Sequence, residues 1–365
     1  MNSQSISVVI AGGGTAGHIE PALAVGEALA VEHGARITAL GTAKGLERDI
    51  VPARGVDLRL ITPVPIPRKL NADLAKLPFN LVKSVRETRA VLKDVSADAV
   101  FGTGGYVAAP AYLAAKSLGL PFYVLETNAL AGMANKLGVR LGGIGLNATA
   151  NSGMPGEVVG IPVRPSLAAA NAGEAAAVAA AAREKWELSA DRPVILVTGG
   201  SQGAQSINAA VAGALDSLLE DNQVLHAYGK KNERPAGADR AGYTALPYID
   251  DMAGALAVAD LVICRSGAMT VAEVSAAHLP AIYIPLPIGN GEQALNSKDL
   301  VAAGAAVQIA DADLSPELLT RTVREILDDP QRRAAMVEAV SSNSAGDVSR
   351  TLASRIASRI REARS

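Results

Sequence analysis

The chain of 365 residues is 49% hydrophobic and 19% charged, carries a net charge of −2 and contains one cysteine. This length indicates two domains, and the composition excludes a disordered chain and any global attraction to nucleic acid. The cysteine, Cys264, excludes an internal disulfide and suits a reducing cytoplasm, and its apolar strand indicates packing and not reactivity.

No stretch of the sequence is long and apolar enough to cross a bilayer. The first residues also lack the cationic and apolar regions of a signal peptide. We therefore expect a soluble protein, or one that is at most peripheral at a membrane.

A Gly-rich turn follows the first predicted strand, residues 6–11. It matches G-x-G-x-x-G between Gly12 and Gly17, the pattern of a dinucleotide site. That site also needs an acidic residue after the next strand, but the strand at 37–40 is followed by Gly-Thr. The G-K-[ST] of a nucleotide-triphosphate loop is missing as well, so we interpret the turn as bringing His18 to the carboxyl edge of a sheet.

Strands and helices alternate through the rest of the chain, and its two halves repeat each other. Residues 97–105 match residues 259–267, and residues 8–14 resemble residues 195–201. This repetition predicts an α/β protein with two Rossmann-like domains, each built on a parallel sheet. Between its two matched turns the first half is longer by about 25 residues, which indicates an insertion.

The insertion, residues 61–86, is rich in proline, leucine and basic residues, and residues 68–93 carry a local charge of +5. This pattern suits contact of Lys76, Lys83 and Arg86 with an anionic membrane surface, with residues 77–79 as an apolar wedge. Taken alone, the stretch favours the alternative, a solvated basic face on a core helix. In helical projection the basic and apolar faces separate, with Lys83, Arg86 and Lys93 against Leu81, Val82, Val85 and Leu92.

The stretch from residue 261 to residue 296 has the pattern of a ligand site. An apolar strand at 261–264 runs through a turn of small residues into a helix, so the first N–H groups of that helix, from Ala268 to Thr270, can hold a phosphate. Glu273 lies one turn further, where its carboxylate can accept both hydroxyls of a ribose. The pattern predicts a nucleoside-diphosphate site at the carboxyl edge of a sheet; an ordinary strand–helix turn with a surface glutamate is the alternative.

Other polar positions have structural interpretations. Asp250 or Asp251 is expected to cap a helix. Asp311 and Asp313 have the D-x-D letters of a metal–nucleotide site, but a Ser-Pro helix start follows directly, so we interpret both as partners of the helix dipole. No other cluster has metal-ligand spacing, and we expect no metal or cofactor. The last helix, residues 342–365, is expected to pack back on the first domain.

Taken together, these motifs resemble the two-domain GT-B glycosyltransferases, and among them the N-acetylglucosaminyltransferases of peptidoglycan synthesis, over essentially the whole chain. Each motif is weak alone, but their order is specific. The motifs are GGTAGH at 13–18, GTGGYVAAP at 102–110, ETN at 126–128, GIPVR at 160–164, GGSQGA at 199–204, YIDDM at 248–252, CRSGAMTVAE at 264–273 and GEQALN at 291–296.

The resemblance implies two domains that face each other across a cleft. Residues 1–163 would form the acceptor and membrane-facing domain, and residues 164–341 the domain that binds UDP-N-acetylglucosamine (UDP-GlcNAc). The implied reaction moves N-acetylglucosamine to the 4-hydroxyl of the muramoyl sugar of undecaprenyl-pyrophosphoryl-MurNAc-pentapeptide (lipid I), on the cytoplasmic face of the membrane. An epimerase of the same fold acting on UDP-GlcNAc, and a nucleotide-sensing scaffold at the membrane, are the alternatives.

The resemblance also implies which residues act. His18 would be the general base that takes the proton of the attacking hydroxyl, with Glu126 as the second candidate. Displacement would invert the anomeric centre, and the helix N-terminus at Ala268 would stabilise the departing UDP without a metal. At two positions where the family often has a histidine, this chain has Leu125 and Ile288. Neither can act as the general base, which favours His18 for that role.

The implied substrate contacts lie in both halves. The Gly-rich turn of the first half would face the pyrophosphate and the acceptor, and the second half would hold the uracil, ribose and pyrophosphate of the donor. The contact residues are Thr15, Ala16 and Gly17 at that turn, Asn128 and Gln293 at the sugar, Arg164 near the nucleotide, Ile249 at the uracil, Glu273 at the ribose, and Ser201, Ala268, Met269 and Thr270 at the pyrophosphate.

Overall fold

The protein is described by a computed structural model over residues 5–64, 72–164, 175–200, 202–287, 291–343 and 346–364, with the side chains of 72–77 and 175 left out. By its internal contacts the chain divides into two compact units. Unit 1 comprises Met1–Pro165 and Asp347–Ser365, and unit 2 comprises Ser166–Gly346.

Unit 1 is built on a parallel sheet whose described strands number seven, in the order β3-β2-β1-β4-β5-β6-β7. The central strands are mostly apolar and are buried along their whole length, as expected for a sheet covered on both faces. The strands are β1 (Ser7–Gly12), β2 (Arg36–Gly41), β3 (Asp57–Leu60), β4 (Ala99–Gly104), β5 (Phe122–Glu126), β6 (Ile144–Asn147) and β7 (Glu157–Val158).

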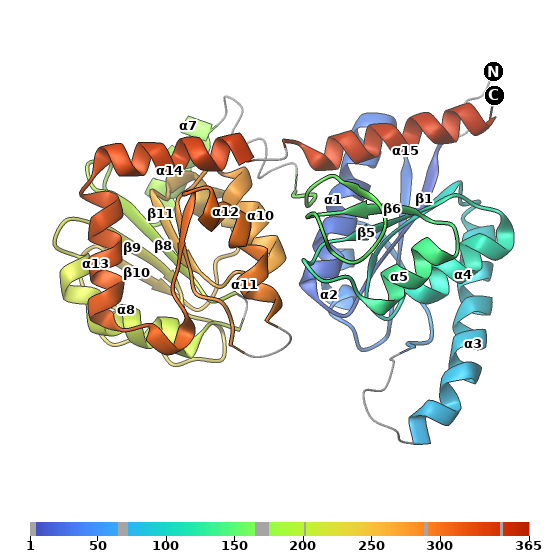
Figure 1. Cartoon of the computed structure of the whole chain (residues 1–365), viewed down its shortest axis with the longest axis horizontal. Coiled ribbons are helices and arrows are strands. Elements are labelled where there is room, and N and C mark those ends of the chain that lie inside the picture. Colours follow the sequence, from blue (N-terminus) through green and yellow to red (C-terminus); the bar gives the residue numbers. More distant parts are fainter. Residues whose placement is uncertain are drawn as a thin grey trace. The chain divides into compact units, whose positions relative to one another are not determined.

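Helices cover both faces of this sheet (Figure 1). One core contains residues of α1 and α15 and one face of β1, β4 and β5, and the other contains residues of α3 and α4 and the opposite face. The helices are α1 (Ala16–His33), α2 (Glu47–Ala53), α3 (Ala72–Asp94), α4 (Ala108–Leu118), α5 (Met133–Arg140) and α15 (Val348–Arg364).

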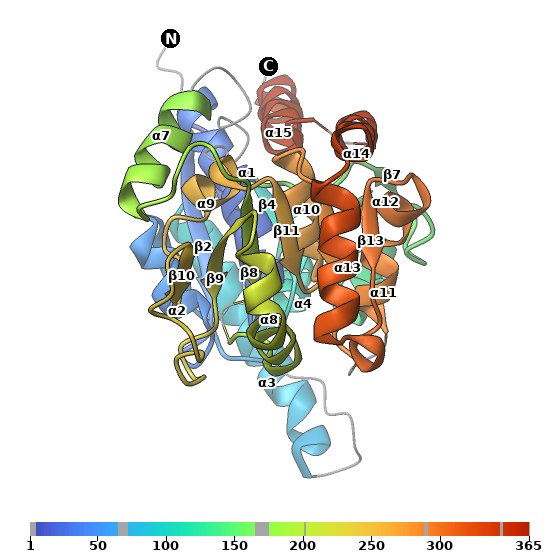
Figure 2. The same ribbon diagram turned by 90° about the vertical axis from the view of Figure 1, so that its left-hand side faces the viewer.

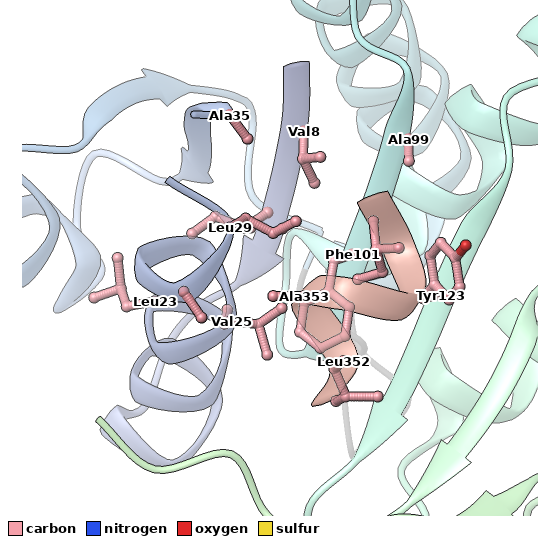
Figure 3. Packing of buried hydrophobic residues seen from close by; sticks show 14 of the residues in the cluster. Val8, Leu23, Val25, Leu29, Ala35, Ala99, Phe101, Tyr123, Leu352 and Ala353 are labelled. Carbon is pink, nitrogen blue, oxygen red and sulfur yellow. The ribbon is translucent and has the colours of Figure 1, made fainter. Parts of the chain in front are cut away.

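The C-terminal helix α15 packs on α1 and completes the core of unit 1. It begins at Val348, later than the predicted residue 342, and its stripe of residues 348, 352, 356 and 360 is buried. Figure 3 shows Leu352 and Ala353 among side chains of α1 and the sheet, such as Val25 and Phe101. The backbone carbonyl of Val163 accepts a hydrogen bond of 2.6 Å from the hydroxyl of Ser349 at the start of α15.

Unit 2 repeats this architecture on a parallel sheet with six described strands in the order β10-β9-β8-β11-β12-β13. Helices α8 and α13 pack side by side over one face (Figure 2), and α7, α9, α10, α12 and α14 contribute to the core on the other. The strands are β8 (Val194–Thr198), β9 (Gln223–Ala227), β10 (Tyr243–Leu246), β11 (Leu261–Cys264), β12 (Ala281–Tyr283) and β13 (Ala306–Gln308). The helices are α7 (Ala175–Lys185), α8 (Gln205–Leu218), α9 (Met252–Val258), α10 (Ala268–Ala276), α11 (Glu292–Asn296), α12 (Lys298–Ala302), α13 (Pro316–Leu327), α14 (Pro330–Asn343) and the 3-10 turn Asp311–Asp313.

The expected α/β fold with two parallel sheets is therefore confirmed. The predicted cap of α9 is Asp251, whose carboxylate accepts a hydrogen bond of 2.9 Å from the backbone N–H of Gly254. Within the described ranges, no helix has the length and apolar character needed to cross a bilayer.

The predicted faces of the insertion helix α3 need one correction. Val82 was expected on the apolar face, but its side chain is 51% exposed and lines a surface groove with Lys83 and Arg86. The physical reason is the helical period, because residues four apart lie on one face and Val82 therefore accompanies Arg86. The residues that α3 buries include Ser84, Thr88 and Leu92.

Candidate functional site

The Gly-rich turn of unit 1 lies at the carboxyl ends of β1, β4 and β5, where ligands of open α/β sheets bind. The backbone N–H of Gly13 donates to the carbonyl of Gly104 at the end of β4, over 3.3 Å. The hydroxyl of Thr127, after β5, donates to the carbonyl of Gly17 over 3.4 Å. The three strand ends are thus joined around the start of α1.

His18 lies in the first turn of α1 and is half-buried. Its carbonyl accepts a hydrogen bond of 2.6 Å from the hydroxyl of Thr103, a buried residue of β4. Its imidazole packs on Gly104, where a Cβ would lie 2.9 Å from two ring atoms and where φ is +120°. Only glycine leaves room for the ring at that position, so β4 fixes both the backbone and the side chain of His18.

Glu126 ends β5 and is completely buried. One carboxylate oxygen accepts from the backbone N–H (2.9 Å) and side-chain amide (3.2 Å) of Asn128. The other accepts from the backbone N–H of Gly132 and the side chain of Asn135, both at 2.9 Å. Burial, with a smaller contribution from the Glu126 charge, raises the pKa of Tyr112 well above its ordinary value, and this phenol donates to Asn135 over 2.9 Å. The carboxylate therefore ties the loop after β5 to the strand.

Unit 2 contains a cavity of about 670 Å³ at the carboxyl ends of β8 and β11. Two strand–helix turns contribute to its wall, the Gly-rich turn after β8 and the turn after β11. The lining residues are Gly199, Gly200, Gln202, Gly203, Ala204, Gln205, Ser206, Arg265, Gly267, Thr270, Leu286, Pro287, Gln293 and Asp311.

The N-terminus of α10 forms part of this wall. Its N-cap is Gly267, which has no side chain to accept from the first N–H groups, and the first turn holds no acidic residue. The N–H groups of Ala268, Met269 and Thr270 therefore remain at the positive end of the helix dipole, on half-buried residues beside the cavity. This geometry suits a diphosphate.

A half-buried ion pair supports the same wall. Arg265, directly after β11, pairs with Asp311 and donates to the carbonyls of Ile284 (3.1 Å) and Pro285 (3.2 Å). Its other terminal nitrogen donates to the hydroxyl of Ser206 (3.0 Å), which donates to Asp311 over 2.6 Å. Burial alone would raise the pKa of the Asp311 carboxyl, but the hydrogen bonds from Ser206 and Arg265 outweigh it and lower that pKa.

This ion pair corrects the predicted role of Asp311, which was expected to act on a helix dipole. The helix start itself is where the sequence placed it, because Ser315 caps α13 through the N–H of Leu318 at 3.2 Å and Pro316 is the first helical residue. The carboxylate of Asp311 instead neutralises Arg265, a partner far away in the sequence. In the described part of the chain, no three His, Cys, Asp or Glu side chains are arranged to hold a metal ion.

The remaining predicted contacts divide between the units. In unit 1, Nε of Arg164 lies 3.8 Å from Glu20 of α1. In unit 2, the side chain of Ile249 is buried in the core, so it can meet a ligand only through its backbone. The amide oxygen of Gln293 on the cavity wall accepts from the N–H of Leu286 at 3.0 Å. Glu273 lies half-buried one turn into α10, and Ser201 and Ile288 lie outside the described residues.

Cys264 has the structural role expected for it, and Trp186 lies in the same core. Both are buried in the core of unit 2. Burial, with a smaller contribution from the Glu273 charge, raises the pKa of the Cys264 thiol far above neutral pH, so the thiolate nucleophile does not form.

Two domain families match the sequence. The model described as the glycosyltransferase family 28 N-terminal domain matches residues 8–141, and the one described as the glycosyltransferase family 28 C-terminal domain matches residues 194–352.

Relatives match over nearly the whole chain. A Corynebacterium efficiens protein is 61% identical over 97% of this chain and 97% of its own, and a Mycobacterium avium protein is 53% identical over 96% and 88%. Both are named UDP-N-acetylglucosamine–N-acetylmuramyl-(pentapeptide) pyrophosphoryl-undecaprenol N-acetylglucosamine transferase. The crystal structure of Acinetobacter baumannii MurG is similar with a TM-score of 0.71 at 29% identity, covering 98% of this chain and 99% of its own. The glycosyltransferase SnogD from Streptomyces nogalater, at 18% identity and a TM-score of 0.68 over 98% of this chain and 100% of its own, is similar in fold alone.

Proposed function

The chain belongs to glycosyltransferase family 28, and from this premise we propose that it transfers N-acetylglucosamine from UDP-GlcNAc to the 4-hydroxyl of the muramoyl sugar of lipid I. The observation that carries the proposal is the uncapped N-terminus of α10 on the wall of the unit 2 cavity. The relatives over nearly the full length are named as transferases, which disfavours the epimerase alternative.

In this proposal the donor binds in unit 2. Its pyrophosphate lies at the N-terminus of α10, where N–H groups and the helix dipole stabilise the charge that develops on the departing UDP. Glu273 accepts from the ribose hydroxyls, and the backbone of Ile249 meets the uracil. Thr270 and Gln293, both on the cavity wall, hold the phosphate and sugar ends of the donor. Ser201 and Arg164 are further contacts implied by the motifs alone.

The general base in this proposal is His18. Its imidazole is held by β4 at the carboxyl edge of the unit 1 sheet, next to the loop that carries Asn128. It takes the proton of the acceptor hydroxyl while that oxygen displaces UDP, which inverts the anomeric centre. Glu126 is less suited to this role, because each of its oxygens already accepts two hydrogen bonds within the protein. We assign it to holding the loop that carries Asn128.

The acceptor ends in a polyprenyl chain, so we propose that unit 1 meets an anionic membrane surface, the cytoplasmic face of the cell membrane. Phe79 is 78% exposed on α3, and it lines a groove of about 540 Å³ with Val82, Lys83 and Arg86. Exposed apolar side chains among basic ones suit an interface of lipid tails and anionic headgroups. The side chain of Lys76, predicted to join them, lies outside the described residues.

The test is a transfer assay with radiolabelled UDP-GlcNAc and a short-chain lipid I analogue, run beside a reaction without acceptor. We expect labelled disaccharide product only when the acceptor is present. Conversion of UDP-GlcNAc without acceptor would return the function to an epimerase, and donor binding without any turnover would return it to a scaffold.

A further inference from the structure

Glu47, in the first turn of α2, is a buried carboxylate that the proposed mechanism does not use. Its side chain is 0% exposed. One oxygen accepts from the backbone N–H (2.8 Å) and the hydroxyl (2.9 Å) of Thr42, and the other accepts from the backbone N–H of Gly14 at 3.0 Å. A buried carboxylate is costly unless donors surround it, and here two backbone amides and one hydroxyl do so.

The surrounding backbone is built to admit this carboxylate. A Cβ on Gly45 would lie 2.1 Å from a Glu47 oxygen, and one on Gly41 would lie 2.6 Å from its Cγ. A Cβ on Gly13 would lie 3.4 Å from the same carboxylate. Gly41 and Gly45 therefore leave the space that the acid fills, whereas a Cβ on Gly13 would only touch it.

The bond to Gly14 connects Glu47 to the proposed base. Gly14 has φ of +85° in the Gly-rich turn, Thr15 is the N-cap of α1, and His18 lies in the first helical turn. Glu47 thus holds the turn on one side of the helix start, while Thr103 and Gly104 of β4 hold His18 on the other. Because the Gly14 N–H already donates to Glu47, it does not point at a phosphate, in contrast to the uncapped first N–H groups of α10 beside the unit 2 cavity.

We propose that Glu47 is a positioning residue of the transfer reaction: by binding the Gly14 amide, its carboxylate sets the start of α1 and so the place of the His18 imidazole. This inference rests on the proposed function. It assigns Glu47 no contact with substrate.

The first variant is Glu47→Gln. Its amide offers one oxygen and one NH₂ group, so the backbone N–H of either Thr42 or Gly14 must face another donor. We expect kcat to fall by about 10- to 100-fold, the scale of a misplacement near 1 Å. The KM for UDP-GlcNAc should stay within about twofold, because Glu47 itself has no proposed contact with the donor and the cavity proposed to hold the pyrophosphate lies in unit 2.

The matched control is Thr42→Val, which removes one donor from the same buried carboxylate and leaves its bond to Gly14 intact. We expect this variant to lose thermal stability but to keep kcat within about twofold of wild type. Glu47→Asp, which keeps the charge but shortens the side chain, should lower kcat as Glu47→Gln does. It gives the same comparison if Glu47→Gln does not fold.

A double variant separates positioning from general destabilisation. If Glu47 acts through His18, Glu47→Gln should change the kcat of His18→Ala by less than about twofold, because the base is already gone. The inference would be overturned if Glu47→Gln lowered kcat by the same factor with His18 present and with His18→Ala. It would also be overturned if Glu47→Gln and Glu47→Asp both kept the wild-type kcat. In either case, transfer by the wild type would leave the proposed function standing. Absence of acceptor-dependent transfer by the wild type would overturn both.

Discussion

The imidazole of His18 is the group on which the proposed chemistry depends most directly. His18→Ala should lower kcat by about 10²- to 10⁴-fold, because no other group takes the proton of the attacking hydroxyl. The dissociation constant for UDP-GlcNAc, measured by calorimetry, should change little, since His18 has no proposed contact with the donor. His33→Ala is the control, because His33 lies at the opposite end of α1, where it hydrogen-bonds to Ser354 over 3.3 Å. Near-normal turnover of His18→Ala would remove His18 from the mechanism.

His226 makes the stability of unit 2 depend on pH. It is completely buried, and burial lowers its pKa to about 4. Its ring nitrogens lie 2.8 Å from the hydroxyl of Tyr243 and 3.1 Å from the side-chain oxygen of Asn208, so it joins β9 to β10 and α8 as a neutral ring. As the pH falls from about 6.5 to 4, the unfolded chain takes up a proton that the folded chain refuses, which lowers the free energy of unfolding by up to about 3 kcal/mol.

The measurement is chemical denaturation of the wild type and His226→Gln at several values from pH 7 to pH 4. The variant should be less stable at pH 7, because it loses the two hydrogen bonds, but should lose less stability on acidification. His33→Gln, in unit 1, should keep the wild-type pH dependence of unit 2. Equal slopes for the wild type and His226→Gln would mean that His226 takes up its proton over the same pH range in the folded and unfolded chains, and that burial does not lower its pKa.

At the residue scale, the sequence predicts best those side chains whose role depends on neighbours in the chain. Asp251 and Ser315 are helix caps, and each is determined by the few residues that follow it. Glu47 and Asp311 were missed or misassigned because their partners, Gly14 and Arg265, lie 33 and 46 residues away. An acid in the first turn of a short helix looks like a dipole partner unless the fold is known.

At the scale of single elements, α3 carries the next prediction. Replacing Lys76, Lys83 and Arg86 with Glu should weaken binding to vesicles that contain anionic lipid, and the loss should be greatest at low salt. Co-sedimentation with anionic and neutral vesicles over a range of salt concentrations measures this. The matched control changes three exposed basic residues elsewhere by the same total charge: Lys231, Arg321 and Arg361.

The control variant should bind anionic vesicles nearly as well as the wild type. If both triple variants lose binding equally, net charge alone is responsible and α3 has no special role. If the α3 variant binds as the wild type does, the basic residues of α3 form a solvated face that does not contact the membrane, which was the alternative interpretation.

The positions of strands could be predicted from apolar runs in the sequence, whereas the buried and exposed faces of α3 could not. The strand at 261–264 was predicted with the bounds that β11 has, because a short apolar run between polar turns leaves little choice. In α3 the buried face includes Ser84 and Thr88, two polar residues, so hydrophobicity alone could not identify it. Their burial depends on packing against the rest of unit 1, which is not visible in the helix sequence.

At the scale of the whole molecule, the internal repeat predicted two parallel sheets because each half repeats its strand–turn–helix pattern. The Gly-rich turns that follow β1 and β8 occupy equivalent places in the two halves but have different surroundings. In the turn after β1 the Gly14 amide donates to the Glu47 carboxylate, and the turn after β8 lines an open cavity. The sequence alone did not reveal this difference, since both turns have similar Gly-rich letters. The acid that distinguishes them lies on another element.

The path of α15 leads to a prediction about which unit the end of the chain stabilises. Leu352 is completely buried in the core of unit 1, although unit 2 directly precedes it in the sequence. Leu352→Ala should lower the free energy of unfolding of unit 1 by about 2–5 kcal/mol, through lost burial and the cavity left behind. Hydrogen exchange measured by mass spectrometry should show faster exchange in β1, β4 and α1 and unchanged exchange in β8 and β11.

Ile326→Ala, in the core of unit 2, should give the opposite pattern. Faster exchange in both units from either change would mean that they unfold as one cooperative body, and the division into two units would then describe contacts and not stability.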